Sequence, residues 1–338
     1  MFKSKKTLVS IVVAVAMLLT LMPMTAVLAA TGTGGAEGSV TVSNYTPVIG
    51  VPTIDALTST GTITLTIPVT DHNTLNDITE IWVVLGWAAG GADPDLSALD
   101  TNGEADVDLI GIMKWTATAG DFALVGPTGT NWSVANKAGA SVEPTLTANS
   151  GDFVFEFTVS EVARYGTGGV SDGWDVYIMV TDGTGADTDT SLLDKAMAAY
   201  ASVSAASPVD FGSVVIGASR VALSNPADKY VTTSVVNKGY ALQINSENWT
   251  GVSSGTLTLD ADGSPATDAL SLEVDDDGTK VAIQYVTASA VTITGHATDG
   301  PSTVEAGDAV DIYLWISMGS SITVPETYGG TITMTVVY

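Results

Sequence analysis

Two groups of aspartate and asparagine residues offer side-chain oxygens that could bind a metal ion. Ca²⁺ takes roughly six to eight such hard oxygen ligands, often from more than one loop. The alternative is that these are ordinary turn residues, because Asn, Asp and Gly favour turns for backbone reasons. We predict a structural Ca²⁺ site formed by seven residues in two loops: Asp71, Asn73, Asn76, Asp77, Asp182, Asp187 and Asp189.

A second acidic region, near residue 270, is a weaker candidate for metal binding. It includes Asp260, Asp262, Asp268 and the run Asp275–Asp277. Residues 260–263 match only a fragment of an EF-hand loop and lack the glutamate expected at its twelfth position. We therefore expect solvated acidic turns here.

The residues needed for nucleophilic catalysis are almost absent from the sequence. It contains no cysteine and two histidines, His72 and His296, each expected in a surface loop. There is no G-x-S-x-G motif, and zinc would require ligands that are chiefly Cys and His. The acidic residues form no recognisable carboxylate pair for glycoside hydrolysis. We predict that the protein is not an enzyme and has no catalytic or cofactor-binding residues.

The elements expected to position the acidic loops are β-strands, because apolar residues recur with a period of two. Glycine, threonine and valine are abundant, which also favours strands and turns over long helices. The first set of predicted strands is 62–70, 78–85, 114–116, 121–124, 152–159 and 174–181. The second set is 229–236, 240–245, 256–259, 270–274, 280–286, 310–318 and 331–337.

These strands predict an all-β protein with two tandem immunoglobulin-like β-sandwich domains, residues 39–203 and 204–338. In the first domain, 62–70 and 78–85 would occupy the B and C positions. Residues 174–181 and a strand near 196–202 would occupy F and G. The B–C and F–G loops of such a sandwich emerge at one end, which would bring the two acidic groups together. The Ala-rich segment Ser191–Tyr200 could hold a turn of helix.

A short motif in the second domain resembles a known family. The run Pro208–Val214, followed by Val235–Leu242, resembles the opening of hydin-like immunoglobulin-type modules, in which a DFG-x-V strand precedes a V-x-N-x-G hairpin. Residues Thr70–Ile78 similarly resemble a loop of repeat-bearing prokaryotic surface sandwiches. Families of both kinds are mostly stalk, adhesion or envelope modules, so the resemblance implies a surface protein. It carries little information on function beyond that.

The amino terminus has the pattern of an export signal. Lysines at positions 3, 5 and 6 precede an apolar core, and small residues end the segment near Ala29. We predict a signal peptide over residues 1–29, followed by a flexible lead over 30–38. The alternative is a single membrane anchor, for which the apolar stretch is short. No later apolar run could span a bilayer, so we expect an extracellular protein at the cell surface, without membrane insertion after signal cleavage.

The mature chain would be strongly acidic. From Ala30 onward it has 8 basic and 37 acidic residues, a formal charge of −29. Such a surface repels nucleic acid and anionic lipid, attracts divalent cations and promotes solubility. Self-association of this chain would require salt or bound cations to screen the charge.

The tryptophans bear on a possible carbohydrate-binding surface. Trp82, Trp174 and Trp315 lie within apolar strands and are expected in the core. Trp132 and Trp249 lie near turns and are expected to be partly exposed. Their triplets are also N-glycosylation sequons, and the three candidate glycosylation sites are Asn44, Asn131 and Asn248.

The sequence favours a secreted structural protein that self-assembles into a pilus-like surface filament or a surface layer. The segment Ser39–Ser43 alternates, and a neighbouring molecule could accept it as a donated strand, with Val40 and Val42 filling a groove. The other option is that this strand pairs within its own domain. The alternative function is a monomeric adhesin or carbohydrate-binding module, for which cell-surface glycans would be the partners.

Overall fold

The computed structural model describes residues 44–87, 109–170, 172–205, 208–226, 229–279, 283–298, 302 and 307–338. Apart from one short 3₁₀ turn, the regular elements in these ranges are β-strands, so the protein is all-β as predicted. None of the helical segments in the described ranges is long and apolar enough to cross a bilayer. The predicted signal peptide, the lead and the strand Ser39–Ser43, with Val40 and Val42, lie outside the described residues.

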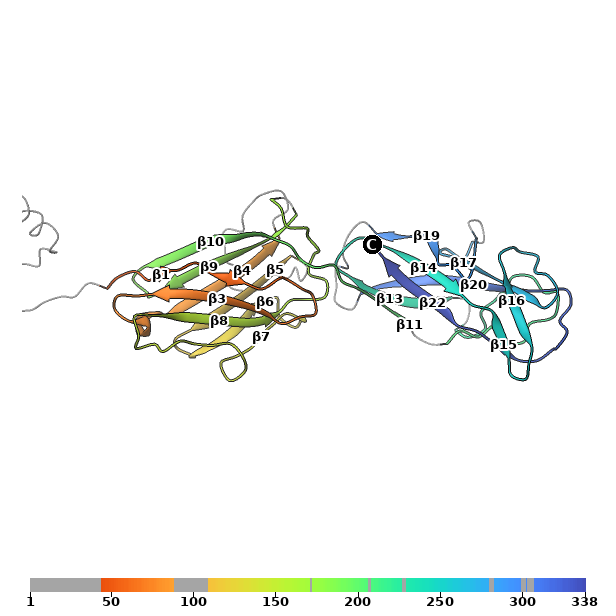
Figure 1. The fold of residues 1–338 in the computed structure, drawn as a ribbon, viewed down its shortest axis with the longest axis horizontal. Helices are drawn as coiled ribbons and strands as arrows, with labels where there is room; N and C mark the ends of the chain where they lie inside the picture. Colours follow the sequence, from red (N-terminus) through yellow and green to blue (C-terminus); the bar gives the residue numbers. More distant parts are fainter. Residues whose placement is uncertain are drawn as a thin grey trace, which may run out of the picture. The chain divides into compact units, whose positions relative to one another are not determined.

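The first half of the described chain forms two five-stranded sheets, which we call the first sheet pair (Figure 1). One sheet has the order β1-β3-β8-β7, with β2 also paired to β3, and the other has the order β10-β9-β4-β5-β6. The strands are β1 (Val48–Ile49), β2 (Thr53–Ile54), β3 (Ile63–Thr70), β4 (Glu80–Trp87), β5 (Ile110–Thr116), β6 (Asp121–Gly126), β7 (Ser133–Val134), β8 (Ser150–Thr158), β9 (Trp174–Thr181) and β10 (Ala186–Lys195).

Alternating side chains build the core of the first sheet pair. Ile67 pairs with Phe153 and Leu65 with Phe155 in the β3–β8 register, and all four side chains are fully buried. Each polar neighbour turns to the other face, as a strand period of two requires. The alternation predicted for 62–70 and 152–159 is therefore confirmed.

Strand β4 is central in its sheet and is buried on both faces. Ile81 and Val83 belong to the main core, whereas Trp82 and Val84 belong to a second apolar cluster on the opposite face. This explains why residues 78–85 are apolar almost throughout, and it confirms the prediction of a central strand.

The second half forms a nine-stranded and a three-stranded sheet, which we call the second sheet pair (Figure 1). The larger sheet has the order β11-β13-β20-β17-β16-β15-β21, with β12 paired to β20 and β18 to β17, and the smaller has the order β19-β14-β22. The strands are β11 (Ala201–Ala205), β12 (Val221–Ala222), β13 (Tyr230–Val236), β14 (Tyr240–Ser246), β15 (Trp249–Gly251), β16 (Thr256–Asp260), β17 (Ala269–Asp275), β18 (Gln284–Tyr285), β19 (Val291–Thr298), β20 (Asp308–Met318), β21 (Tyr328–Gly329) and β22 (Ile332–Val337).

Several predicted elements differ from the structure. The segment Ser191–Tyr200 holds no helical turn, because β10 continues to Lys195, and β10, not a strand near 196–202, is the neighbour of β9. Within 280–286 only β18 is a described strand, and β19 was not predicted. The V-x-N-x-G run is not a hairpin: β13 and β14 lie in different sheets, so residues 237–239 cross between them.

Asn237, in this crossing, is fully buried and bonded on every side. Its Nδ2 donates to Ser59 Oγ (3.0 Å) and to the Ala198 carbonyl (2.8 Å). Its Oδ1 accepts from the Tyr200 amide (2.7 Å), and its carbonyl accepts from the Tyr165 amide (2.8 Å). The side chain thus connects the β13–β14 crossing to the chain that leads into β11.

We expect Asn237→Ala to lower the free energy of unfolding by about 1–3 kcal/mol, because it leaves buried partners without their hydrogen bonds. Urea denaturation monitored by tryptophan fluorescence measures the change. The matched control is Asn76→Ala in EDTA, since Asn76 is exposed and should cost less than about 0.5 kcal/mol. Equal midpoints for the two variants would contradict this role.

Candidate metal centre

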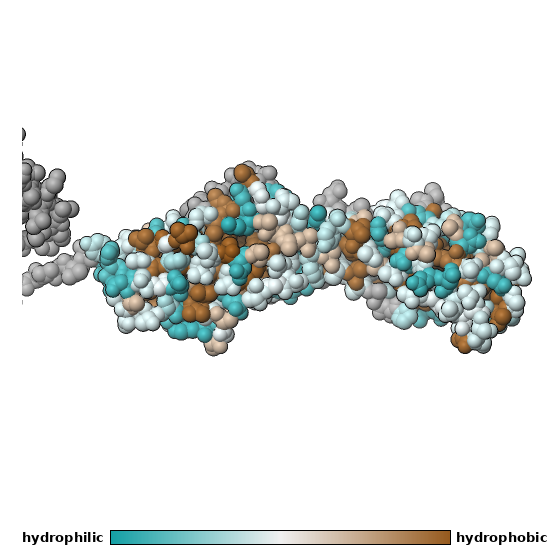
Figure 2. Space-filling model, viewed as in Figure 1, coloured by the Kyte–Doolittle hydropathy of each residue, from teal (hydrophilic) through white to brown (hydrophobic). Residues whose placement is uncertain are grey.

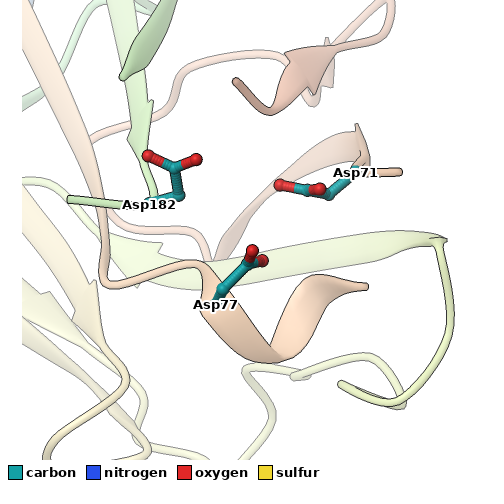
Figure 3. A group of neighbouring side chains, drawn as sticks. All are labelled: Asp71, Asp77 and Asp182. Carbon is teal, nitrogen blue, oxygen red and sulfur yellow. The ribbon is translucent and has the colours of Figure 1, made fainter. Parts of the chain in front are cut away.

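Three of the predicted ligands converge at one end of the first sheet pair. Asp71, Asp77 and Asp182 each offer a carboxylate oxygen, and these oxygens lie within 4.8 Å of one another. Figure 3 shows the three side chains pointing into a shared space. They come from the two loops that the sequence placed together, one between β3 and β4 and the other between β9 and β10.

Hydrogen bonds to the backbone hold both loops in place. The Asp71 amide donates to the Asn149 carbonyl (2.8 Å), and Asn149 Nδ2 donates back to the Asp71 carbonyl (3.1 Å). Asp77 ends the 3₁₀ turn η1 (Leu75–Asp77), and the following Thr79 amide donates to the Thr181 carbonyl (2.7 Å), beside Asp182. The positions of the carboxylates are therefore set by β8 and β9 as well as by their own loops.

Asp71 is the most deeply buried member, with 1% of its surface exposed. Its Oδ1 accepts a hydrogen bond from the Asn73 amide (2.7 Å). Its Oδ2 is buried and has no hydrogen-bond partner among the described residues. Burying a carboxylate oxygen without a partner is costly, and a cation bound at this oxygen would remove that cost.

Asp182 is also buried, and its Oδ1 accepts from the Thr184 amide (2.7 Å), the Thr184 hydroxyl (2.9 Å) and the Gly185 amide (2.7 Å). Burial by itself raises the pKa of Asp182, but these hydrogen bonds outweigh it and hold the pKa below its ordinary value. The group is therefore a carboxylate at neutral pH, as a metal ligand must be.

The spacing of the three oxygens fits Ca²⁺. Ligand oxygens lie roughly 2.3–2.6 Å from Ca²⁺, so two ligands on opposite sides of the ion are about 5 Å apart. The 4.8 Å limit of this cluster falls within that span.

The other four predicted ligands have different roles. Asn73 Oδ1 accepts from the Tyr45 amide (3.0 Å), and the Asn76 side chain is exposed. Asp187 Oδ2 accepts from the Ile49 amide (2.8 Å), which joins β1 to β10. Asp189 Oδ1 accepts from the amide and hydroxyl of Ser191. The structure brings together three of the seven residues and uses at least three of the others as structural acceptors.

Two features of the loops were not visible in the sequence. Thr74 has φ = 107°, a strained conformation for a β-branched residue, of the kind that often occurs in binding loops. Asn149 Nδ2 bonds the carbonyls of Asp71 and His72 from the turn before β8. Asn149 is 77 or more residues away from both in the sequence, so nothing local in the sequence indicates this contact.

The acidic residues of the second sheet pair behave as turn residues. Asp262 Oδ1 accepts from the Ser264 amide, and Asp277 Oδ1 accepts from the Thr279 amide (2.8 Å each). Asp268 accepts from the Thr323 hydroxyl and amide, and both bonds lower its pKa. Asp260 accepts from the Ala266 amide. Asp275, Asp276 and Asp277 have their carboxylates close together, but Asp275 ends strand β17 and is buried, unlike the solvated turn residue that was expected. Consecutive acidic residues do not by themselves form a site.

The predicted burial was right for the tryptophans within strands and wrong for the two tryptophans near turns. Trp82, Trp174 and Trp315 are buried as expected. Trp132 and Trp249, expected to be partly exposed, are also buried, with 2% and 9% of their surface exposed. The ring of Trp132 lies against Gly111 and that of Trp249 against Gly330, where a side chain would clash with either ring.

The remaining candidate residues are the three asparagines of the glycosylation sequons and the two histidines. Asn131 and Asn248 are exposed, as glycosylation would require, and Asn44 is half-buried. His72 is exposed in its loop, with its ring edge-on to that of Tyr45 at 5.2 Å. His296 lies in strand β19 and not in the turn that was predicted; its side chain is outside the description.

Comparison with known proteins does not assign the chain to a family. No protein-family model matches it, and no curated protein is significantly similar to it. The resemblance to hydin-like modules therefore remains a prediction.

Proposed function

We propose that this protein is an extracellular structural protein that self-assembles into a surface filament or a surface layer. A Ca²⁺ ion held by Asp71, Asp77 and Asp182 stabilises each subunit near the start of the described chain. The assembly contact is a strand donated between copies. The predicted export signal and the acidic surface agree with a role outside the cell.

The observation that carries the proposal is an exposed apolar edge at the start of the described chain. Tyr45, Val48 and Val51 have 57%, 55% and 82% of their surface exposed. Val48 lies in β1, which pairs only with β3 among the described strands. The outer side of β1 faces β10, where Asp187 accepts from the Ile49 amide, so this region offers a second chain its exposed apolar side chains. Figure 2 also shows apolar residues among hydrophilic ones on the drawn face.

The candidate metal centre lies next to this edge. Asn73, whose amide donates to Asp71, also accepts from the Tyr45 amide, so one loop contacts both the carboxylate cluster and the edge. A cation that fixes the loop would thereby fix the point where the amino-terminal segment leaves the sheets. It would also offset part of the −29 charge that opposes association.

The alternative of a monomeric carbohydrate-binding module has less support. Sugar-binding surfaces use exposed aromatic rings, and the two tryptophans that favoured this alternative, Trp132 and Trp249, are buried. We therefore place assembly first.

Negative-stain microscopy of the chain from Ala30 to Tyr338 tests the proposal. In 10 mM CaCl₂ at physiological ionic strength we expect fibres or a lattice, and in EDTA at low salt we expect dispersed particles. A parallel sample in EDTA at high salt separates general charge screening from a specific need for Ca²⁺. Dispersed particles under all conditions would contradict self-assembly.

A further inference from the structure

The second sheet pair has a groove along one side, with Asp210 and Glu326 among the residues that line its larger part and mainly apolar residues around its smaller part. One part, of about 480 Å³, is lined by residues that include Phe211, Trp249, Leu270 and Tyr328. An adjoining part, of about 230 Å³, is lined by residues that include Val203 and Met334. Val209 and Gly330 line both parts, so the two parts adjoin each other.

The smaller part of the groove lies between two edge strands, β11 and β22, which contact each other along part of their length. Strand β22 pairs only with β14, and β11 pairs only with β13, among the described strands. The backbone groups on the outer side of β22 therefore have no strand partner within the described structure. A further extended segment beside β22 could satisfy them by adding to the three-stranded sheet.

The side chains of β22 also show that the core is incompletely covered here. Ile332, Met334 and Val336 point inward but are only half-buried. Their counterparts on the neighbouring strand, Leu242 and Ile244, are completely buried. The inward face of β22 thus retains apolar surface that another segment could cover, with a favourable free energy of burial.

We infer that this groove receives the segment Ser39–Ser43 of a second copy of the chain, which lies along β22. This inference rests on the proposed function and identifies its acceptor surface. The segment carries no charge and alternates Ser-Val-Thr-Val-Ser. Val40 and Val42 repeat every second residue, as do Ile332 and Met334, so both apolar rows can face the same core.

The position of the segment in the chain favours a second copy as its source. The described chain begins beside Asn73, at the end of the first sheet pair that holds the acidic cluster. After β10 the chain leaves the first sheet pair near Ala198, whose amide donates to the Leu57 carbonyl. Leu57 precedes β3, at the opposite end of that strand from Asn73. The eight residues of β3 separate these two ends by roughly 25 Å.

A donor at one end of a subunit and an acceptor in its following sheet pair make a head-to-tail contact. Such a contact does not close on itself by twofold symmetry, so it extends into a filament or a ring. The exposed residues Val215, Ile216, Val252 and Val324 lie on the loops of the second sheet pair. Ile216 lines the groove, so this apolar surface continues beyond it.

Disulfide trapping tests the inference, because the natural chain has no cysteine. One mature protein carries Val42→Cys and a second carries Met334→Cys; the two are mixed in Ca²⁺ and treated with a mild oxidant. We expect a covalent dimer that reductant dissolves. The matched control replaces Met334→Cys with Thr335→Cys, whose side chain lies on the exposed face of β22. It should give at least tenfold less dimer.

Other outcomes would overturn the inference. Equal dimer yields for the two acceptor variants would mean that the segment does not enter the groove. A single chain carrying both Val42→Cys and Met334→Cys that crosslinks only internally would mean that the segment fills its own groove. Unchanged thermal unfolding midpoints confirm that each variant is folded.

A further variant separates this inference from the proposed function. If Met334→Glu still forms the fibres or lattice seen with the natural sequence, the groove is not the acceptor although the protein assembles. If the specific dimer forms but microscopy shows only dispersed particles, the groove is the acceptor and extended assembly is wrong. Thr335→Glu, with the same added charge on the outer face, is the control and should assemble normally.

Discussion

We expect calcium to raise the thermal unfolding midpoint of the mature protein, and Asp71→Asn to abolish the increase. Extracellular Ca²⁺ sites commonly have dissociation constants on the order of 10⁻⁴ M. At 10 mM Ca²⁺ such a site would stabilise the folded state by about 2.7 kcal/mol. For a sheet pair of this size the midpoint would rise by roughly 5–10 °C. Differential scanning calorimetry with and without Ca²⁺ measures the shift.

Asp71→Asn is an informative substitution because it changes only the charge. Asparagine keeps an oxygen that can accept from the Asn73 amide, as Asp71 Oδ1 does. In EDTA we expect the variant to be at least as stable as the natural protein, since the substitution removes one of three mutually repelling carboxylates. In Ca²⁺ the order should reverse, because the natural protein alone gains the bound ion.

The control for this experiment is Asp152→Asn, an exposed aspartate in β8 of the same sheet pair. It removes the same charge but lies outside the cluster, so its Ca²⁺-dependent shift should equal that of the natural protein. If Ca²⁺ stabilises neither protein, or stabilises Asp71→Asn equally, the cluster does not bind the ion. The acidic residues would then be ordinary turn residues.

The alternation of side chains predicted most strands because it reflects local geometry. Phe153, Phe155 and Phe157 face the core simply because they share one face of β8. Strand β10 was missed because its register with β9 shifts twice, once on each side of Leu192. A strand with such irregularities loses the period of two, and Asp194, at φ = 56°, adds a further break.

The candidate site was predictable only in part, for a related physical reason. Sequence spacing placed the two loops at one end of the sheets, but it could not show which carboxylates turn inward. Asp187 and Asp189 lie on β10, where they accept hydrogen bonds from backbone amides. The choice between ligand and structural acceptor depends on partners such as Ile49, which are far away in the sequence.

The buried tryptophans show the same limit. Trp132 fits against Gly111, and Trp249 fits against Gly330, because a glycine leaves room for the indole ring. Neither glycine is near its tryptophan in the sequence, so the turn-like surroundings of each indole predicted exposure. Contacts between distant residues decide burial, and a single sequence does not reveal them.

We expect Arg220→Met to lower the free energy of unfolding by about 3 kcal/mol, because it leaves a buried carboxylate without its countercharge. Glu273, in the central strand β17, has 1% of its surface exposed. Its Oε2 accepts from Arg220 Nε (2.8 Å), and its Oε1 accepts from Ser317 Oγ (3.4 Å). Urea denaturation of the mature protein measures the loss.

Two comparisons show whether the buried carboxylate causes this loss. Lys229→Met removes the cation of an ion pair with Asp311 in which both side chains are more than 40% exposed. Exposed pairs contribute about 0–1 kcal/mol, so this control should change little. Adding Glu273→Leu to Arg220→Met should recover most of the loss, because it removes the unpaired charge. If the double variant is as unstable as Arg220→Met alone, the loss comes from Arg220 itself. The features to examine would then be the Arg220 backbone, at φ = 53°, and the hydrogen bond that its amide donates to Ser317 Oγ.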